Sequence, residues 1–148
     1  MAVPIRVGAA VAVVHAVPPE ASMLLFLTYF AYSILCLAVG LVVHTRITPV
    51  REWTLVRQGN VAAACSLGGT AIGLALPIAS LAVHAVSLLD MAQWSAIALA
   101  VQLLTWFVLS RVVGGMAAEI ERDNRAVGGL AAAFSVALGA INAACLSY

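Results

Sequence analysis

Few side chains in this sequence can carry acid–base, nucleophilic or metal chemistry. The 148 residues include only six acids: Glu20, Glu52 and Asp90 stand alone, and three more follow one another closely at 119, 121 and 123. The spacings of a serine hydrolase (G-x-S-x-G), of a zinc protease (H-E-x-x-H) and of a phosphate-binding lysine are all absent. We therefore expect no catalytic residue and a protein that is not an enzyme.

Histidine and cysteine are the remaining metal-ligating types, and their positions do not converge. The histidines lie in the N-terminal tail and at the ends of two apolar stretches: His15, His44 and His84. The cysteines show no paired spacing of the C-x-x-C kind that metal sites usually have: Cys36, Cys65 and Cys145. We expect neither a metal site nor a cofactor.

Neutral polar side chains inside apolar stretches are the more informative group. Gln102 lies among apolar neighbours, Asn142 lies near the end of the last apolar stretch, and Thr70 lies within the second. An amide at membrane depth faces protein or water, so Gln102 either bonds between helices or lines a pore or ligand cavity. The apolar stretches hold no carboxylate, which argues against a proton-coupled pump but leaves a channel possible.

The elements that must position these residues are membrane-spanning helices. Hydrophobic residues make up 64% of the chain and charged residues 9%, whereas a soluble domain carries about 25% charged residues. Four stretches reach the roughly 20 apolar residues that a span needs, at 23–43, 61–83, 91–112 and 126–147. We expect an all-α, integral membrane four-helix bundle.

Arginine is the only cationic type apart from histidine, and the loops divide the arginines unevenly. The first loop holds Arg46, Arg51 and Arg57, and the third holds Arg122 and Arg125 after the span that ends near Arg111. The second loop holds none. Since positively charged loops stay in the cytoplasm, loops one and three should lie inside and both termini outside. The net charge of +1 gives no argument for nucleic-acid binding.

An offset of 64 residues relates the two halves of the chain. It aligns Asn60 with Asn124 and matches two blocks rich in Gly, Ala, Ser and Cys. The sequence thus predicts two helical hairpins, at 23–89 and 90–148, that enter the membrane in the same orientation. Residues 1–22 form a tail or a short apolar interfacial segment, or translation begins at Met23.

A short element precedes the second span of each hairpin. In "ITPVREWTLVRQGN", Thr48 is a candidate cap for a helix that begins at Pro49. An apolar stripe of Val50, Trp53 and Val56 would lie on the membrane, with Trp53 at headgroup depth and with Arg51, Glu52 and Arg57 off the stripe. Met116 and Ile120 form the matching stripe, and Asn60 and Asn124 are candidate caps of the following spans.

Small residues mark one face of the second span. Cys65, Gly69, Gly73 and Pro77 recur every four residues, and the 64-residue offset carries this face to Gly129, Ala133, Ala137 and Ile141. Small residues let helices approach closely in lipid, so these faces should meet each other or a second subunit. Pro77 removes one backbone hydrogen bond, so we expect a kink there.

The segments "ITPVREW", "QGNVAAA", "GLALPIASLAVHAVSLLDMAQW" and "NAACLSY" resemble the YjfL-like family of small bacterial inner-membrane proteins. The resemblance covers about residues 23–148. It implies an inner-membrane location, two tandem copies of a two-helix domain of unknown function, and a setting in envelope stress or membrane maintenance. It implies no agreed activity.

Two functions fit these expectations. One is a non-enzymatic membrane component that forms a homo-oligomer through its small-residue faces and offers its arginine loops to anionic lipid or a cytosolic partner. The other is a small oligomeric channel for ions or polar solutes, with Thr70, Gln102 and Asn142 along the path near the kink at Pro77.

Overall fold

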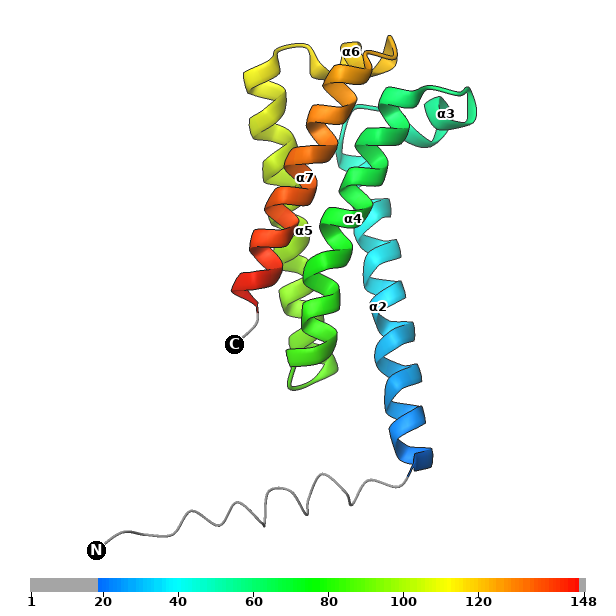
Figure 1. The fold of residues 1–148 in the computed structure, drawn as a ribbon, viewed down its shortest axis with the longest axis vertical. Helices are drawn as coiled ribbons and strands as arrows, with labels where there is room; N and C mark the ends of the chain where they lie inside the picture. Colours follow the sequence, from blue (N-terminus) through cyan, green and yellow to red (C-terminus); the bar gives the residue numbers. More distant parts are fainter. Residues whose placement is uncertain (1–18, 147–148) are drawn as a thin grey trace, which may run out of the picture.

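The computed structural model describes residues 19–146, with side chains from residue 22 onward. Six helices make up this part of the chain: α2 (Pro19–Ile47), α3 (Glu52–Arg57), α4 (Val61–His84), α5 (Leu88–Val113), α6 (Met116–Glu121) and α7 (Arg125–Cys145). Four of them are long and apolar enough to cross a bilayer, which confirms the four-helix membrane bundle (Figure 1). The interpretation of residues 1–18 as a tail lies outside the described residues, and α2 begins before Met23.

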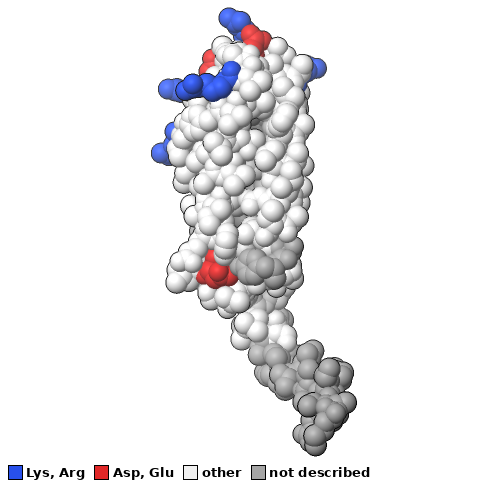
Figure 2. All heavy atoms as spheres, turned by 90° about the vertical axis from the view of Figure 1, so that its left-hand side faces the viewer, with Lys and Arg blue, Asp and Glu red and all other residues white. Residues whose placement is uncertain are grey.

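The bundle has two different ends. The short helices α3 and α6 lie together at one end, and the described chain both starts and finishes at the other (Figure 1). Helices α4 and α7 therefore run parallel to each other, and α2 and α5 run the opposite way. Arginine side chains surround the end that bears α3 and α6, as Figure 2 shows for one face. We call this the arginine end.

The 64-residue offset reappears in the local geometry. Helix α3 maps onto α6 at both bounds, and the starts of α4 and α7 also differ by 64. After each short helix comes a residue with positive φ, Gly59 at 85° and Asp123 at 60°. The next residue closes the turn: the Asn60 amide donates to Leu55 O at 3.0 Å, and the Asn124 amide donates to Glu119 O at 2.9 Å. The same turn therefore precedes both α4 and α7.

Helix α4 is the centre of the bundle. It contacts the other three long helices and both short ones, and its closest neighbour along its whole length is α7. Helix α5 packs on α2, α4, α6 and α7, whereas α2 packs mainly on α4 and α5. Two buried apolar clusters lie toward the two ends, one including Trp106 and Ile120 at the arginine end and one including Leu81 and Met91 at the other.

The small residues of α4 are used inside the molecule. A Cβ added at Gly69 would lie 2.6 Å from the Cβ of Ala132, and one at Gly73 would collide with the Gln102 side chain and the Ser135 backbone. Such close approach is what small residues allow in a solvent that gives helices no hydrophobic drive. Pro77, on the same helix, is also buried.

The face of α7 that meets α4 differs from the predicted one. Gly128, Ala132, Ser135 and Gly139 face α4, whereas Gly129 has open space around it and Ala133 and Ala137 are exposed. The two helices have different neighbours: α5 packs on both α4 and α7, whereas α2 packs on α4 and makes no comparable contact with α7. Cys65 is only half-buried, and Ile141 is 59% exposed.

The predicted start of the short helix is also wrong. Helix α3 begins at Glu52, and the Thr48 hydroxyl donates back to His44 O at 3.0 Å, so Thr48 closes α2 and does not cap α3. Because Val50 precedes the helix, it does not share a helical face with Trp53: Val50 is 1% exposed and Trp53 is 52% exposed. Met116 and Ile120, which do lie on one helix, are both buried.

Candidate functional site

Buried polar side chains extend from the arginine end to the middle of the bundle. They come from all four spans, from α3 and from the turn before it: His44, Thr48, Glu52, Ser66, Thr70, Gln102 and Ser135. Buried polar groups normally have a hydrogen-bond partner, so those without one are candidates for function. The buried atoms without a partner include His44 Nδ1, both carboxyl oxygens of Glu52, Ser66 Oγ and Gln102 Oε1.

Gln102 lies at the deepest point of this group. Its Nε2 donates to the Ser135 backbone carbonyl at 3.0 Å, which joins α5 to α7 beside Gly73 of α4. Thr70 is 1% exposed and Gln102 is 2% exposed. Asn142 is half-buried, and no hydrogen bond joins its side chain to either of them within the described residues. The three proposed pore-lining residues therefore do not form one connected polar group.

Glu52 is the feature that sequence reasoning missed. It is the first residue of α3, it is 1% exposed, and neither of its carboxyl oxygens has a hydrogen-bond partner. Burial raises the pKa of Glu52 to about 7, although its own backbone amide acts in the opposite direction. A glutamate between two arginines is usually solvated. The 64-residue offset, however, aligns Glu52 with the apolar Met116, and this alignment could have indicated a buried position.

His44 lies at the same end of the bundle, on the last turn of α2. Its ring is 1% exposed and meets Trp106 of α5 edge to face, with the ring centroids 6.0 Å apart. Trp106 in turn belongs to the apolar cluster with Val50. The surroundings of His44 are thus aromatic and aliphatic, and its Nδ1 has no partner.

Polar contacts tie the two arginine-end turns to each other. Asn60 Nδ2 donates to Ile120 O at 2.8 Å and to Glu121 O at 3.2 Å, while its Oδ1 accepts the Ala63 amide as the cap of α4. Asp123 Oδ1 accepts the Ala62 amide at 2.8 Å. This amide lowers the pKa of Asp123, and the Val61 amide and Arg125 act in the same direction. Asn124 caps α7 through the Val127 amide.

The outer surface of the arginine end is rich in positive charge. The six predicted surface residues are all exposed: Arg46, Arg51, Trp53, Arg57, Arg122 and Arg125. Within the described residues, ion pairs join Arg122 to Glu119 at 3.3 Å and Arg125 to Asp123 at 3.5 Å. Neither pair includes Arg51 or Arg57, so the positive charge around α3 is the less compensated part of this surface.

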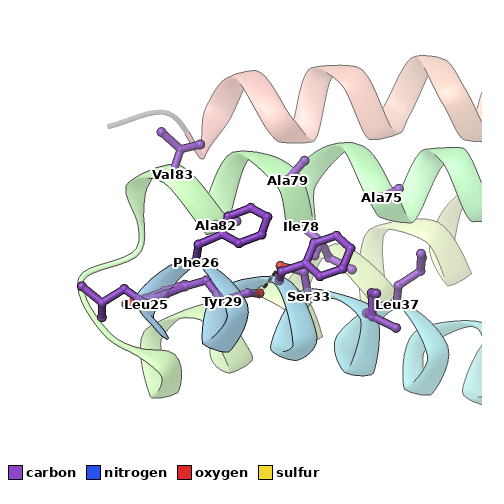
Figure 3. A pocket seen from close by; sticks show the side chains of 12 residues that line it. Leu25, Phe26, Tyr29, Ser33, Leu37, Ala75, Ile78, Ala79, Ala82 and Val83 are labelled. Atoms are coloured by element: carbon purple, nitrogen blue, oxygen red, sulfur yellow. Dashed lines mark hydrogen bonds between the residues drawn. The ribbon is translucent and has the colours of Figure 1, made fainter. Parts of the chain in front are cut away.

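An apolar groove lies toward the other end, between α2 and α4. It has a volume of about 580 Å³, and Phe26, Phe30, Ile78 and Ala82 line it (Figure 3). Two hydroxyl-bearing residues line it, Tyr29 and Ser33, and the Ser33 hydroxyl donates to the Tyr29 backbone carbonyl at 2.7 Å. Its lining is otherwise apolar, so the groove holds no cluster of ionisable side chains.

The described residues do not assemble a catalytic or metal-binding constellation. Among the described side chains, residues 22–146, no three His, Cys, Asp or Glu come together in a way that could hold a metal ion. The cysteines in this part of the chain are free, with Cys36 and Cys65 half-buried and Cys145 exposed. What the arrangement offers is a polar, partly unsatisfied interior beneath a positively charged surface.

Four spanning helices and an arginine-bearing end define a multi-pass inner-membrane protein. The chain belongs to the family described as Domain of Unknown Function (DUF350), whose match covers residues 9–146. The resemblance to YjfL-like proteins is thereby confirmed, and it extends further toward the N-terminus than residue 23.

Two bacterial relatives illustrate this membership. The chain is 33% identical over 127 residues to the "UPF0719 inner membrane protein YjfL" of Escherichia coli (strain K12), covering 86% of this chain and 96% of the relative. It is 32% identical over 122 residues to the "UPF0719 transmembrane protein YshE" of Bacillus subtilis (strain 168), covering 78% and 88%. No solved structure shows a significant match. The names of these relatives state a membrane location and do not mention an activity.

Proposed function

We propose that this protein is a non-enzymatic inner-membrane component that self-associates through the outward face of α7. Its arginine end would then hold several copies of a positively charged surface against anionic lipid or a cytosolic partner, in maintenance of the cell envelope. The observation that carries the proposal is the distribution of small residues on α7, which has two small-residue faces where one would suffice for the monomer.

The inner of these faces is occupied by α4, and the outer one is open. Gly129, Ala133 and Ala137 repeat every four residues on the outer face, and three more alanines extend it at 126, 140 and 144. Nothing lies within 4 Å of a Cβ built at Gly129. Small residues at this spacing let two helices approach closely in lipid. A second copy of α7 is the simplest surface that would fit this face.

The arginine end supports the second half of the proposal. Each Lys or Arg near an anionic membrane surface contributes about 1 kcal/mol to binding. Arg46, Arg51 and Arg57 are exposed around α3. Trp53 is 52% exposed on the same helix, as suits an aromatic side chain at headgroup depth. Self-association would multiply the charge that such a surface presents.

Crosslinking in native membranes tests the self-association. In a background without the three native cysteines, a single cysteine at Ala140 should give a disulfide-linked dimer on oxidation. The double change Ala133→Leu and Ala137→Leu should abolish that dimer, because bulky side chains separate the two backbones. The matched control is Ala96→Leu with Ala100→Leu on the exposed face of α5. Equal dimer yields in both double variants would refute association through α7.

A further inference from the structure

Helix α3 is attached to the bundle through a short inner face. Glu52 is buried, Leu55 and Val56 are half-buried, and α3 packs on α4. The remaining side chains of α3, Trp53, Thr54 and Arg57, are exposed, and so is Arg51 just before the helix. Only three of the side chains of α3 face the bundle, and one of these three carries a carboxyl group.

No positive or polar side chain compensates the charge of Glu52. Neither carboxyl oxygen has a hydrogen-bond partner, and neither of the ion pairs in the described chain includes this residue. The ionisable groups on the neighbouring elements are exposed or engaged elsewhere. Arg46, Arg111 and Glu121 are exposed, and Glu119 accepts a hydrogen bond from Asn124. His44 faces Trp106, and Cys65 is half-buried and free. An unpaired carboxylate in such a site is costly, so the docked helix favours the protonated acid.

The second half of the chain shows that the position does not require an acid. Met116 occupies the position 64 residues later, as the first residue of α6, and is 1% exposed. The two short helices have equal length and are followed by the same turn. An apolar side chain therefore suffices to dock this kind of helix, and Glu52 adds a property that packing alone does not need.

We propose that Glu52 is a proton-binding site at the cytoplasmic end, where the bound proton keeps α3 docked on α4 and its loss releases α3 toward the lipid headgroups. The pKa of about 7 lies in the range of cytosolic pH, so the site would change state under physiological conditions. Because the docked state holds the proton more tightly than the released state, docking weakens as pH rises. Release would move Arg51, Trp53 and Arg57 together, and so alter the charged surface.

Infrared spectroscopy of the full chain in lipid nanodiscs tests the proton site directly. A protonated carboxyl gives a C=O stretch that is separate from the carboxylate bands, and this band should disappear with a midpoint near pH 7 as the pH is raised. The component of this band that titrates near pH 7 should be absent in Glu52→Gln and Glu52→Met, while any carboxyl band from the other acids of the chain should be the same in all three proteins. A component near pH 7 that persists in these variants, or a wild-type band that titrates only near the ordinary glutamate pKa of about 4.3, would overturn the proposal.

A distance measurement tests the release of α3. Spin labels at Arg57→Cys and Arg122→Cys, in a background without the native cysteines, report the separation of α3 from the α6 turn. The longer-distance population should grow at least severalfold between about pH 6 and about pH 8, one unit on either side of the midpoint. Glu52→Gln and Glu52→Met should keep the short distance at both values.

A further variant moves the acid to the second short helix, and so tests the proposal even where the Glu52 variants fold poorly. Met116→Glu, which places an acid at the matching position of α6, should make the α6 turn pH-dependent in the same direction when measured in the Glu52→Met background. Unchanged distances in the wild-type chain across this pH range, or an equal shift in Glu52→Gln, would overturn the release of α3.

Discussion

Two glycines of α4 show how the identity of a single residue depends on its neighbours. Gly73 faces Gln102 and Ser135, and an added Cβ would collide with both. Gly68, five residues earlier, is exposed, and nothing lies within 4 Å of a Cβ at that position. The same residue type is thus required at one position for close approach and replaceable at the other.

We expect Gly73→Ala to destabilise the bundle by about 1–3 kcal/mol, because the methyl group forces α5 or α7 to move. Gly68→Ala should be neutral or should stabilise by up to about 1 kcal/mol, because alanine loses less conformational freedom in a helix. Steric-trapping measurements of unfolding in bicelles can compare the two variants. Equal losses of stability in both would show that the contacts around Gly73 do not limit packing.

At this scale the sequence predicted some residues of the site and missed others. Gln102 stood out because an amide is rare at membrane depth, and the structure places it at a junction of three helices. Glu52 and His44 were not selected, because charged or polar residues beside a loop are usually solvated. Their burial depends on how α3 folds back over the bundle, which is a tertiary fact that local sequence does not contain.

The turn after each short helix is the element on which the arginine end is built. It combines a positive-φ residue with an asparagine cap, and it occurs at Gly59–Asn60 and again 64 residues later. The two copies differ in their outward bonds. Asn60 Nδ2 donates to the backbone carbonyls of the last two residues of α6, whereas Asn124 Nδ2 donates to the nearby Glu119 side chain at 2.8 Å.

Removing the two caps should therefore have unequal costs. Asn124→Ala should cost about 1–2 kcal/mol of stability, about 1 kcal/mol for the lost cap and up to about 1 kcal/mol for the bond to Glu119. Asn60→Ala should cost about 2–3 kcal/mol, because about 1 kcal/mol is lost for each bond to the carbonyls of Ile120 and Glu121. Hydrogen exchange of the α6–α7 turn, measured alongside unfolding, should rise in Asn60→Ala. No change in exchange there would contradict a link between the two turns.

The sequence predicted the spans and the turns better than it predicted how the helices pack. Length and composition suffice to predict four spans. Every backbone N–H and C=O group in lipid must be hydrogen-bonded, so a segment that crosses the hydrocarbon layer must be one continuous apolar helix of about 20 residues. The starts of α4 and α7 followed from asparagines whose caps act within one turn. The α7 contact face was not predictable from the offset, because the helix neighbours of α4 and α7 are not equivalent.

The whole molecule is electrically one-sided. In the described chain, every arginine lies at the end that bears α3 and α6, while Asp90 and His84 lie at the other. Figure 2 shows the gathering of blue side chains at the arginine end for one face. Charges on the two sides of this end are arranged differently, since the α6 side pairs its arginines with acids and the α3 side does not. The contact with anionic lipid should therefore be strongest around α3.

Neutralising arginines on the two sides separates this contact from a general effect of charge. Arg51→Gln with Arg57→Gln should weaken the preference for anionic over zwitterionic lipid by about 2 kcal/mol, at about 1 kcal/mol per arginine. Arg122→Gln with Arg125→Gln removes the same charge, but it should have a smaller effect, because the acids beside them already offset much of their field. Quenching of Trp53 by brominated anionic lipid, in competition with zwitterionic lipid, measures the preference. If both double variants lose equal preference, then net charge governs the contact, and the arrangement of arginines around α3 has no special part in it.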